Sequence, residues 1–364
     1  MSRLSIHGVG VVGGFGCGVD ALAGALVSGD VPVNEVRPDP SDETIRLPAF
    51  LADSAPLKEF FNKRAVRRID HFSRLALLGA CLALKDAGLL ERGRDRMGVV
   101  VATGYGATRT TFAFLDTVID DGDICASPTH FSNSVHNAAA AHIAIQLQVG
   151  GPNLTVSQFD MSVPSALMTA RQWLDEGRVD RVLFGAVDEY CQVLGYCWER
   201  FFGSASVHAV TPFDFTRQSA IVGEGAAFFV LSQGETGTRY GTIDDIGLSN
   251  LTGGVPLLPE KTAFFLGTDG HRQCSASYDA IVPVGALVAA YAPLYGSLPV
   301  GQAFDLAIAA LAIRDRRIPA SPVKAEGINR WKIIGDEKLD ERAICCLKAD
   351  ATGNYGLLTI KEDS

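Results

Sequence analysis

Asp160 lies where the sequence pattern predicts that a turn presents one side chain for chemistry. The stretch GGPNLTVSQFDMSVPSALMTARQWLDEGRVDRVLFGAVDE predicts a strand over 153–159, a turn at Asp160, a helix that stops at Gly177 and a strand over 179–189. At a helix start, free backbone N–H groups favour an anion. Aspartate is an excellent N-cap, so its residue type predicts that Asp160 caps the helix.

A second candidate motif is the glycine pattern GVGVVG. Gly8, Gly10 and Gly13 have GxGxxG spacing between a predicted strand and a predicted helix. This is the dinucleotide-binding fingerprint, because glycines let the backbone approach a pyrophosphate. The acidic residue expected to bind the ribose is not clear, since Asp30 and Glu35 lie in a stretch with glycine and proline. The same glycines also serve close packing, so both interpretations stay open.

Cysteine and histidine positions predict no metal site. The eight cysteines form no CxxC pair and no cluster with histidine at metal-ligand spacing. Most of them lie among apolar neighbours, where cysteine behaves as a small hydrophobe, and this usage indicates a reducing compartment. We therefore expect a cytoplasmic protein that binds no metal and no cofactor.

Charge and hydropathy disfavour two classes of partner. The 364 residues carry a net charge of -9, and the pI is about 5.3. Such acidity disfavours binding to nucleic acid and to anionic membrane surfaces. The N-terminal MSRLSIHGVG has no signal-peptide layout, and no apolar run approaches transmembrane length. The sequence thus predicts neither nucleic-acid binding nor membrane insertion.

The elements that must position these residues alternate along the chain. Residues 1–233 predict the order β-α-β-α-β-α-β-β, and its last two strands, 179–189 and 225–233, lack a helix of matching size between them. A trimmed copy of this order follows, with convincing helices over 277–296 and 301–318. Such alternation predicts an α/β protein with mainly parallel sheets covered by helices.

Several motifs occur in the order found in a known family. The segment TPFDFTRQSAIVGEGAAFFVLS (211–232) combines PFD, Arg217, GEGA and an apolar strand, and GPNLTV with GRVDRVLFGAVDE brackets a helix. Together these motifs resemble the β-ketoacyl synthases of the thiolase superfamily. The resemblance covers nearly all of 1–233. It implies a thiolase-like fold with two β-α-β-α-β-α-β-β halves in five layers (α-β-α-β-α), namely 1–235 and a shortened 236–364.

The resemblance also implies that the family's catalytic positions are lost. In that family a cysteine at a helix N-terminus takes up the acyl chain, because the helix dipole favours the thiolate, and two histidines assist decarboxylation. By resemblance, the cysteine position falls on Asp160. The first histidine position falls on Leu266 of LGT, and the second on Ser297 of GSLPVGQAFD; His271 is shifted from the first. The implication is a homologue with no catalytic residues.

An acyl tunnel and a subunit interface are implied as well. The family strand order, taken as 3-2-1-4-5, makes 153–159 an edge strand that pairs with another chain across a two-fold axis. The phrase FSNSVHNA looks most like chain-length-factor subunits of bacterial polyene clusters. The residues expected at the tunnel or interface are Phe131, His136, Asn137, Gln158, Phe159, Asp160 and Met161.

Four hypotheses for the function remain at this stage. The preferred one is a chain-length-factor-like subunit that heterodimerises with an active ketosynthase, meets an acyl carrier protein transiently and shapes the acyl tunnel in polyketide or aryl polyene elongation. A malonyl-carrier decarboxylase is the second. Such relatives carry glutamine in the cysteine position and keep the histidines, whereas Gln158 lies two residues earlier here. A free-standing acyl-binding protein and a nucleotide-dependent oxidoreductase are the third and fourth.

Overall fold

Two sheets with the same strand order form the centre of the molecule. The computed structural model describes residues 2–39, 41–234, 238–259, 261–323, 330–340 and 343–362. The first sheet runs β6 (Asn153–Ser157), β5 (Met97–Thr103), β7 (Arg181–Asp188), β9 (Gly225–Gln233) and β1 (Leu4–Gly13). The second runs β12 (Leu287–Ala289), β11 (Thr262–Leu266), β16 (Ala343–Ala349), β17 (Asn354–Lys361) and β10 (Thr242–Asn250), with β14 (Lys332–Ile333) beyond β12.

The two sheets also repeat each other's pairing. In each, three neighbouring strands are parallel, and antiparallel pairings attach the fourth strand to the third and the fifth to the fourth. A short pairing of β1 with β10 joins the sheets into one path. The order in each half is 3-2-4-5-1, so the expected 3-2-1-4-5 is wrong, because β9 returns antiparallel between β7 and β1. The edge position of β6 is confirmed, since β6 ends the path.

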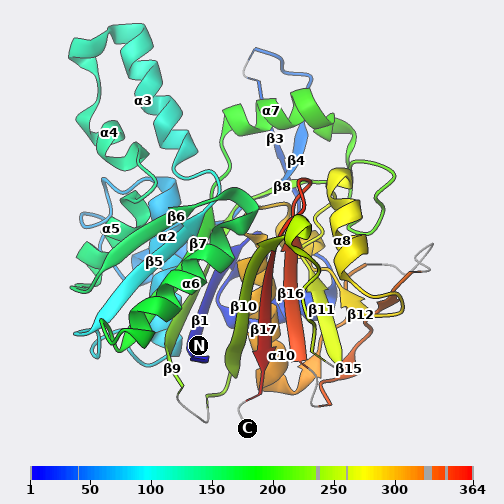
Figure 1. Cartoon of the computed structure of the whole chain (residues 1–364). Coiled ribbons are helices and arrows are strands. Elements are labelled where there is room, and N and C mark those ends of the chain that lie inside the picture. Colours follow the sequence, from blue (N-terminus) through cyan, green and yellow to red (C-terminus); the bar gives the residue numbers. More distant parts are fainter. Residues whose placement is uncertain are drawn as a thin grey trace.

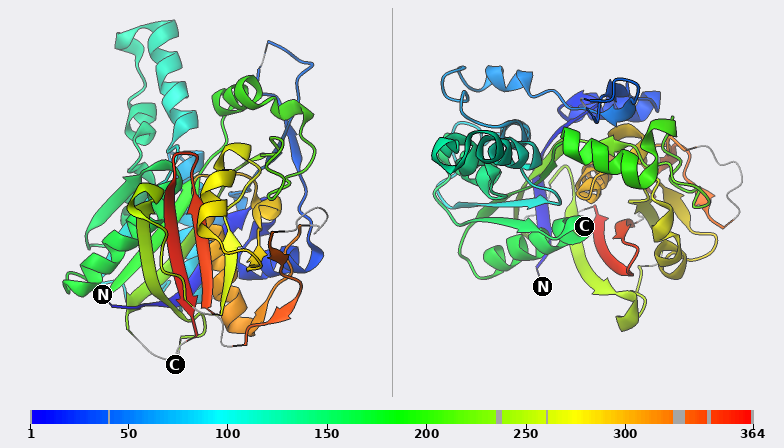
Figure 2. Two further views of the ribbon diagram at one scale, coloured as in Figure 1. Left: turned by 45° about the vertical axis from the view of Figure 1, so that its right-hand side comes forward. Right: turned by 90° about the horizontal axis from the view of Figure 1, so that it is seen from above.

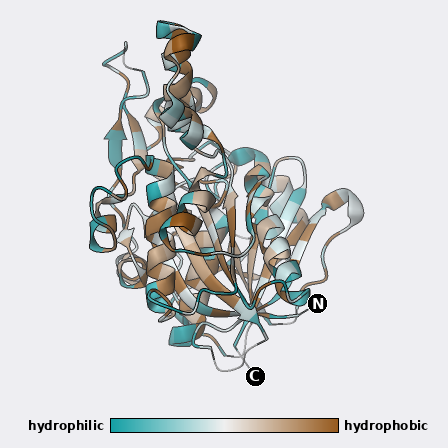
Figure 3. Ribbon diagram, turned by 90° about the vertical axis from the view of Figure 1, so that its left-hand side faces the viewer, coloured by the Kyte–Doolittle hydropathy of each residue, from teal (hydrophilic) through white to brown (hydrophobic). Residues whose placement is uncertain are grey.

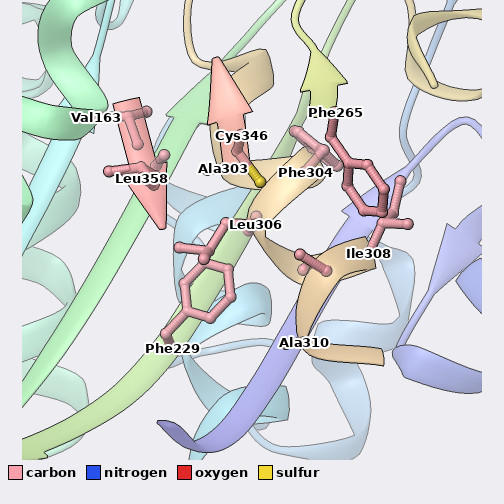
Figure 4. Close-up of a cluster of buried hydrophobic side chains, with 14 of the residues drawn as sticks. Val163, Phe229, Phe265, Ala303, Phe304, Leu306, Ile308, Ala310, Cys346 and Leu358 are labelled. Carbon is pink, nitrogen blue, oxygen red and sulfur yellow. The ribbon is translucent and has the colours of Figure 1, made fainter. Parts of the chain in front are cut away.

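Helices complete five layers, as the fold class predicts (Figure 1). On the outside of the first sheet, α2 (His71–Asp86) packs against β1, β9 and β7, and α8 (Ser275–Ile281) packs against the outer face of the second. Between the sheets lie α6 (Ser162–Asp175) and α10 (Gly301–Asp315). Since α10 contacts strands of both sheets, it is apolar on nearly every side. In Figure 4, its Phe304 and Leu306 lie among side chains of both sheets.

The remaining elements surround this core. An arm of α3 (Thr108–Asp121) and α4 (Pro128–Ser134) projects from the body (Figures 1 and 2). Within the described residues, no helix combines the length and apolar character needed to cross a bilayer. The other helices and strands are α1 (Val19–Ser28), α5 (Ala138–Gln146), α7 (Gln192–Phe202), α9 (Ala292–Tyr295), β2 (Gly16–Cys17), β3 (Asn34–Val36), β4 (Leu47–Phe50), β8 (Val222–Gly223), β13 (Arg317–Ile318) and β15 (Glu337–Lys338).

The glycine pattern GVGVVG serves packing in this structure. Gly8, Gly10 and Gly13 all lie inside β1, and no strand-to-helix turn separates them. A methyl group on Gly10 would lie 2.2 Å from the carbonyl oxygen of Gly79 in α2, and one on Gly8 would lie 2.4 Å from that of Ala83. These glycines let α2 approach the strand closely, and the turn that would cradle a pyrophosphate is not formed there.

Two secondary-structure predictions are wrong. Residues 277–296 form the end of α8, the strand β12 and the short helix α9, and not one helix. Pro283 and Gly285 separate the first two, and the apolar run LVA is a buried parallel strand, which periodicity does not distinguish from a buried helix. The 11-residue helix α7 also lies between β7 and β9, where no helix of matching size was expected.

Candidate functional site

The predicted strand–turn–helix at Asp160 is present. The strand β6 ends at Ser157, the 3₁₀ turn η3 (Phe159–Met161) follows, and α6 starts at Ser162. The buried hydroxyl of Ser162 fixes the turn: it accepts a hydrogen bond from the backbone N–H of Gln158 at 2.7 Å and donates to the carbonyl oxygen of Thr103 at 2.9 Å. The turn therefore lies at the carboxyl ends of β5 and β6, where ligands bind in open α/β sheets.

Asp160 does not cap the helix, and that prediction is wrong. The residue preceding α6 is Met161, and no side chain caps this helix end. The 3₁₀ turn carries Asp160 away from the free N–H groups, and its carboxylate lies 3.4 Å from the ammonium nitrogen of Lys348. An ammonium ion attracts a carboxylate more strongly than a backbone N–H does.

Lys348 holds a polar network that links the two halves. Its ammonium donates to the carbonyl oxygen of Gly267 at 3.1 Å and to the carboxylate of Asp269 at 2.9 Å. The Ser297 hydroxyl donates to the same Asp269 oxygen at 2.8 Å. Lys348 lies at the end of β16, while Gly267 and Asp269 follow β11. With Asp160 from the first half, these residues form an ion-paired network between the two halves.

Electrostatics fix the charge states in this network. Burial opposes the ionisation of Asp269, but the Lys348 ammonium and the Ser297 hydroxyl help to hold its pKa at about 2. Burial also opposes the charge of Lys348, yet Asp269 and Asp160 raise its pKa well above the ordinary value. The pKa of Asp160 is raised by burial, which outweighs the attraction of Lys348. Lys348 is thus a charged ammonium at neutral pH and is not available as a nucleophile.

The two positions aligned with histidines differ in their surroundings. Ser297 is a buried member of the network, whereas Leu266 is fully buried in a hydrophobic cluster with Tyr278 and Leu347. Close to them, the ring of His271 lies 5.3 Å from the ring of Trp198, and its Nδ1 is 2.7 Å from the amide nitrogen of Gln218. The structure therefore brings Ser297 toward Asp160 through Asp269 and Lys348, and it leaves Leu266 in the core.

Sequence reasoning missed Lys348, Asp269 and Cys274. Asp269 directly follows LGT, but its pairing with Lys348 joins two residues that are distant in the chain. The charged groups of Asp269, Lys348 and Asp160 also act on the pKa of the Cys274 thiol. Burial raises its pKa to about 12, so it stays protonated at neutral pH and is a poor nucleophile.

The predicted tunnel and interface residues form two groups. Gln158, Phe159, Asp160 and Met161 border a depression of about 380 Å³, together with residues of β10 and of the turn between β16 and β17. The second group belongs to the arm and α5. It comprises Phe131, whose ring packs 5.4 Å from that of Phe114, His136, which lies against Gly106, and Asn137, which precedes α5.

Comparison with known proteins identifies the family. The model described as "Beta-ketoacyl synthase, N-terminal domain" matches residues 1–236, which is well over half of the chain. This chain therefore belongs to the β-ketoacyl synthase family. A Streptomyces virginiae relative named as a polyketide beta-ketoacyl synthase is 31% identical over 203 residues, which is 52% of this chain and 48% of that protein. A Vibrio cholerae 3-oxoacyl-[acyl-carrier-protein] synthase 2 is 22% identical over 289 residues, covering 76% and 66%.

Solved structures support the fold over the whole chain. A structure described as "The ishigamide ketosynthase/chain length factor" matches with a TM-score of 0.84 and 20% identity, covering 100% of both chains. The ketosynthase ApeO in complex with its chain length factor ApeC, from Xenorhabdus doucetiae, matches with a TM-score of 0.78 and 16% identity, covering 99% and 98%. At these identities the similarity shows the fold. The chain spans about half to two thirds of the length of the curated relatives it matches.

Proposed function

We propose that this chain is a non-catalytic, chain-length-factor-like subunit of a heterodimeric β-ketoacyl-carrier synthase. The observation that carries the proposal is the ion-paired network of Asp160, Lys348 and Asp269 at the family's catalytic position. A carboxylate there is a poor acceptor for thioester exchange, and the nearby thiol of Cys274 keeps its proton. We assign no catalytic residue to the chain and treat Asp160, Leu266 and Ser297 as degenerate catalytic positions.

An active ketosynthase is the proposed partner, and the acyl tunnel is proposed to run along the interface of the two subunits. The edge strand β6 supports this, because it ends the strand path and leaves backbone groups open to pairing with another chain. The likeness in fold to ketosynthase and chain-length-factor complexes supports it as well. In this proposal Phe131, His136 and Asn137 line the interface or tunnel.

An acyl carrier protein is the proposed transient partner. Residues 58–74 gather basic side chains in a chain whose net charge is -9. The segment borders a depression of about 430 Å³, whose walls include Leu57, Phe61 and Val66 beside Lys63, Arg67 and Arg74. A basic rim around an apolar depression fits an acidic partner that delivers an acyl chain.

The remaining parts of the proposal concern context. We propose that the complex works in the cytoplasm, in polyketide or aryl polyene biosynthesis, and that the halves divide at 235/236. That boundary falls within 235–237, outside the described residues. A malonyl-carrier decarboxylase and a free-standing acyl-binding protein are the alternatives. In the first, Gln158 would have to act, but its side chain accepts a hydrogen bond from Ser165 at 2.6 Å and lies two residues from the catalytic position.

Acyl-loading assays test this proposal. The purified chain, a ketosynthase encoded beside it and their complex are each incubated with acyl- and malonyl-carrier, and products are followed by intact-protein mass spectrometry. We expect the acyl group on the ketosynthase alone, elongation by the complex, and no loss of activity in a Cys274→Ala variant of this chain. An acyl group on this chain would refute the non-catalytic role, and acetyl-carrier formed by the chain alone would favour the decarboxylase.

A further inference from the structure

Phe159 combines an exposed aromatic ring with a left-handed backbone. Its side chain is 62% exposed, and its φ is 46°. A bulky side chain at positive φ is strained, because its Cβ crowds the backbone. Such a combination persists only where the surroundings impose it.

The neighbours of Phe159 fix it from both sides. The Tyr105 ring packs edge-on against it, with ring centroids 6.0 Å apart. After it, Asp160 is held by Lys348, and before it the N–H of Gln158 donates to Ser162 at 2.7 Å. The Asp160–Lys348 pair, which performs no chemistry here, thus has a structural consequence: it keeps the turn in the shape that directs Phe159 outward.

The ring lies at the end of a chain segment without charged residues. From Ile124 to Phe159 the sequence contains no Asp, Glu, Lys or Arg, although these types make up 20% of the chain. We call the surface formed by residues 124–159 the uncharged face. It includes α4, α5 and the edge strand β6, and Figure 3 looks onto the side of the molecule that carries them. Its exposed large apolar side chains are Ile124, Phe131, Val135, Ile145, Leu154 and Phe159.

Depletion of charge and enrichment in aromatic residues mark the buried core of protein–protein interfaces. An acyl substrate would need an enclosed apolar channel, whereas the uncharged face includes an open strand edge whose backbone groups another strand can pair with. Phe159 follows directly on that edge strand, beside a depression of about 380 Å³ that can receive a side chain from another subunit. The occupant that fits is a second subunit of the same fold.

We propose that Phe159 is the aromatic anchor of the subunit interface and that Lys348, acting through Asp160, is the positioning residue that presents it. This inference rests on the proposed function, because the ketosynthase is the partner it names. The inference assigns Phe159 to the interface between the subunits and not to the wall of the acyl tunnel. Truncating the ring is therefore expected to weaken association while leaving product length unchanged.

The test measures the Kd of this chain for the ketosynthase, the thermal stability of the free chain and the product lengths of the complex. We expect Phe159→Gly to raise the Kd at least tenfold, as truncation of an interface anchor does. The same variant should not destabilise the free chain, because glycine adopts φ 46° without strain. Phe201→Ala is the matched control: Phe201 is 76% exposed on α7, outside the uncharged face, and its Kd should stay within twofold of wild type.

Asp160→Asn tests the positioning role, because it removes the charge that pairs with Lys348 and leaves the Lys348–Asp269 pair in place, and it should also raise the Kd. Equal Kd values for Phe159→Gly and Phe201→Ala would overturn the proposal. A change in product length with an unchanged Kd in Phe159→Gly would also overturn it, because that result would indicate that Phe159 lines the acyl tunnel. Failure of the wild-type chain to bind any ketosynthase is a separate result, and it would overturn the proposed function itself.

Discussion

At the scale of single residues, Lys348 decides what the site can do. Its ammonium is the cation beside the carboxylates of Asp160 and Asp269, and its side chain is almost fully buried. Buried charges are tolerated when they are paired, whereas removal of one partner leaves an uncompensated charge. The paired network is therefore expected to contribute to the free energy of folding.

Replacing Lys348 tests this directly. We predict that Lys348→Met lowers the free energy of unfolding by about 3–5 kcal/mol at pH 7, because it leaves the buried carboxylate of Asp269 and the partly buried carboxyl group of Asp160 without their cation. Urea unfolding measures the change. The double variant Lys348→Met/Asp269→Asn should recover part of the loss, since it removes one of the stranded charges. A single variant as stable as wild type would show that the network contributes nothing to folding.

Asp305 gives a prediction that depends on pH. Burial raises its pKa to about 7, the hydroxyl of Tyr295 donates to one oxygen, and the other has no hydrogen-bond partner among the described residues. The folded state therefore keeps a proton that the unfolded state releases above about pH 4. Stability from this group is present below pH 4 and is lost as pH rises through 7.

Asp305→Asn should remove that loss. We expect the variant to match wild type near pH 4 and to exceed it at pH 8 by on the order of 3 kcal/mol, because asparagine does not ionise. Chemical denaturation across this pH range checks the difference between the two proteins. Parallel stability curves would contradict the assignment, since other buried carboxyl groups are common to both.

At the scale of elements, local patterns predict much of the first half correctly. The strand expected at 225–233 is β9 to the residue, and the strand–turn–helix around Asp160 is present. The errors arise where tertiary contacts decide. Asp160 was expected to cap a helix, but it pairs instead with Lys348, which is distant in the chain. The buried strand β12 has the same apolar character as a buried helix, so the sequence pattern does not distinguish the two. No local signal in the sequence reports either contact.

Gly10 permits a close approach between the helix α2 and the strand β1. We predict that Gly10→Ala destabilises the fold by several kcal/mol, because its methyl group would lie 2.2 Å from the backbone of α2. Gly24→Ala in α1 is the control, since its surroundings are open. It should be neutral or stabilising by about 1 kcal/mol. Thermal unfolding separates the two variants, and equal effects would show that close packing does not explain Gly10.

At the scale of the whole molecule, the two halves share one middle layer. The helix α10 of the second half contacts β1 and β9 of the first, and α6 of the first half contacts β10 and β17 of the second. A large apolar surface would be exposed if the halves were separated. The repeated strand order therefore describes two halves of one folding unit and not two independent domains.

Separate expression of 1–235 and 236–364 tests that view. We predict that neither piece alone is soluble and cooperatively folded, because α6 and α10 would each lose one of their two sheets. Co-expression of both pieces should recover a soluble complex with the circular dichroism spectrum of the intact chain. A piece of 1–235 that unfolds cooperatively by itself would contradict the shared layer.

The most direct test of the central claim is the native mass of this chain co-expressed with the ketosynthase encoded nearest to it. Under the proposed function, a partner of the same fold covers the uncharged face and pairs with the edge strand β6. The account predicts a one-to-one complex and an insoluble or unstable chain in the absence of the ketosynthase. A stable homodimer that ignores the ketosynthase would contradict it and would favour a free-standing acyl-binding protein.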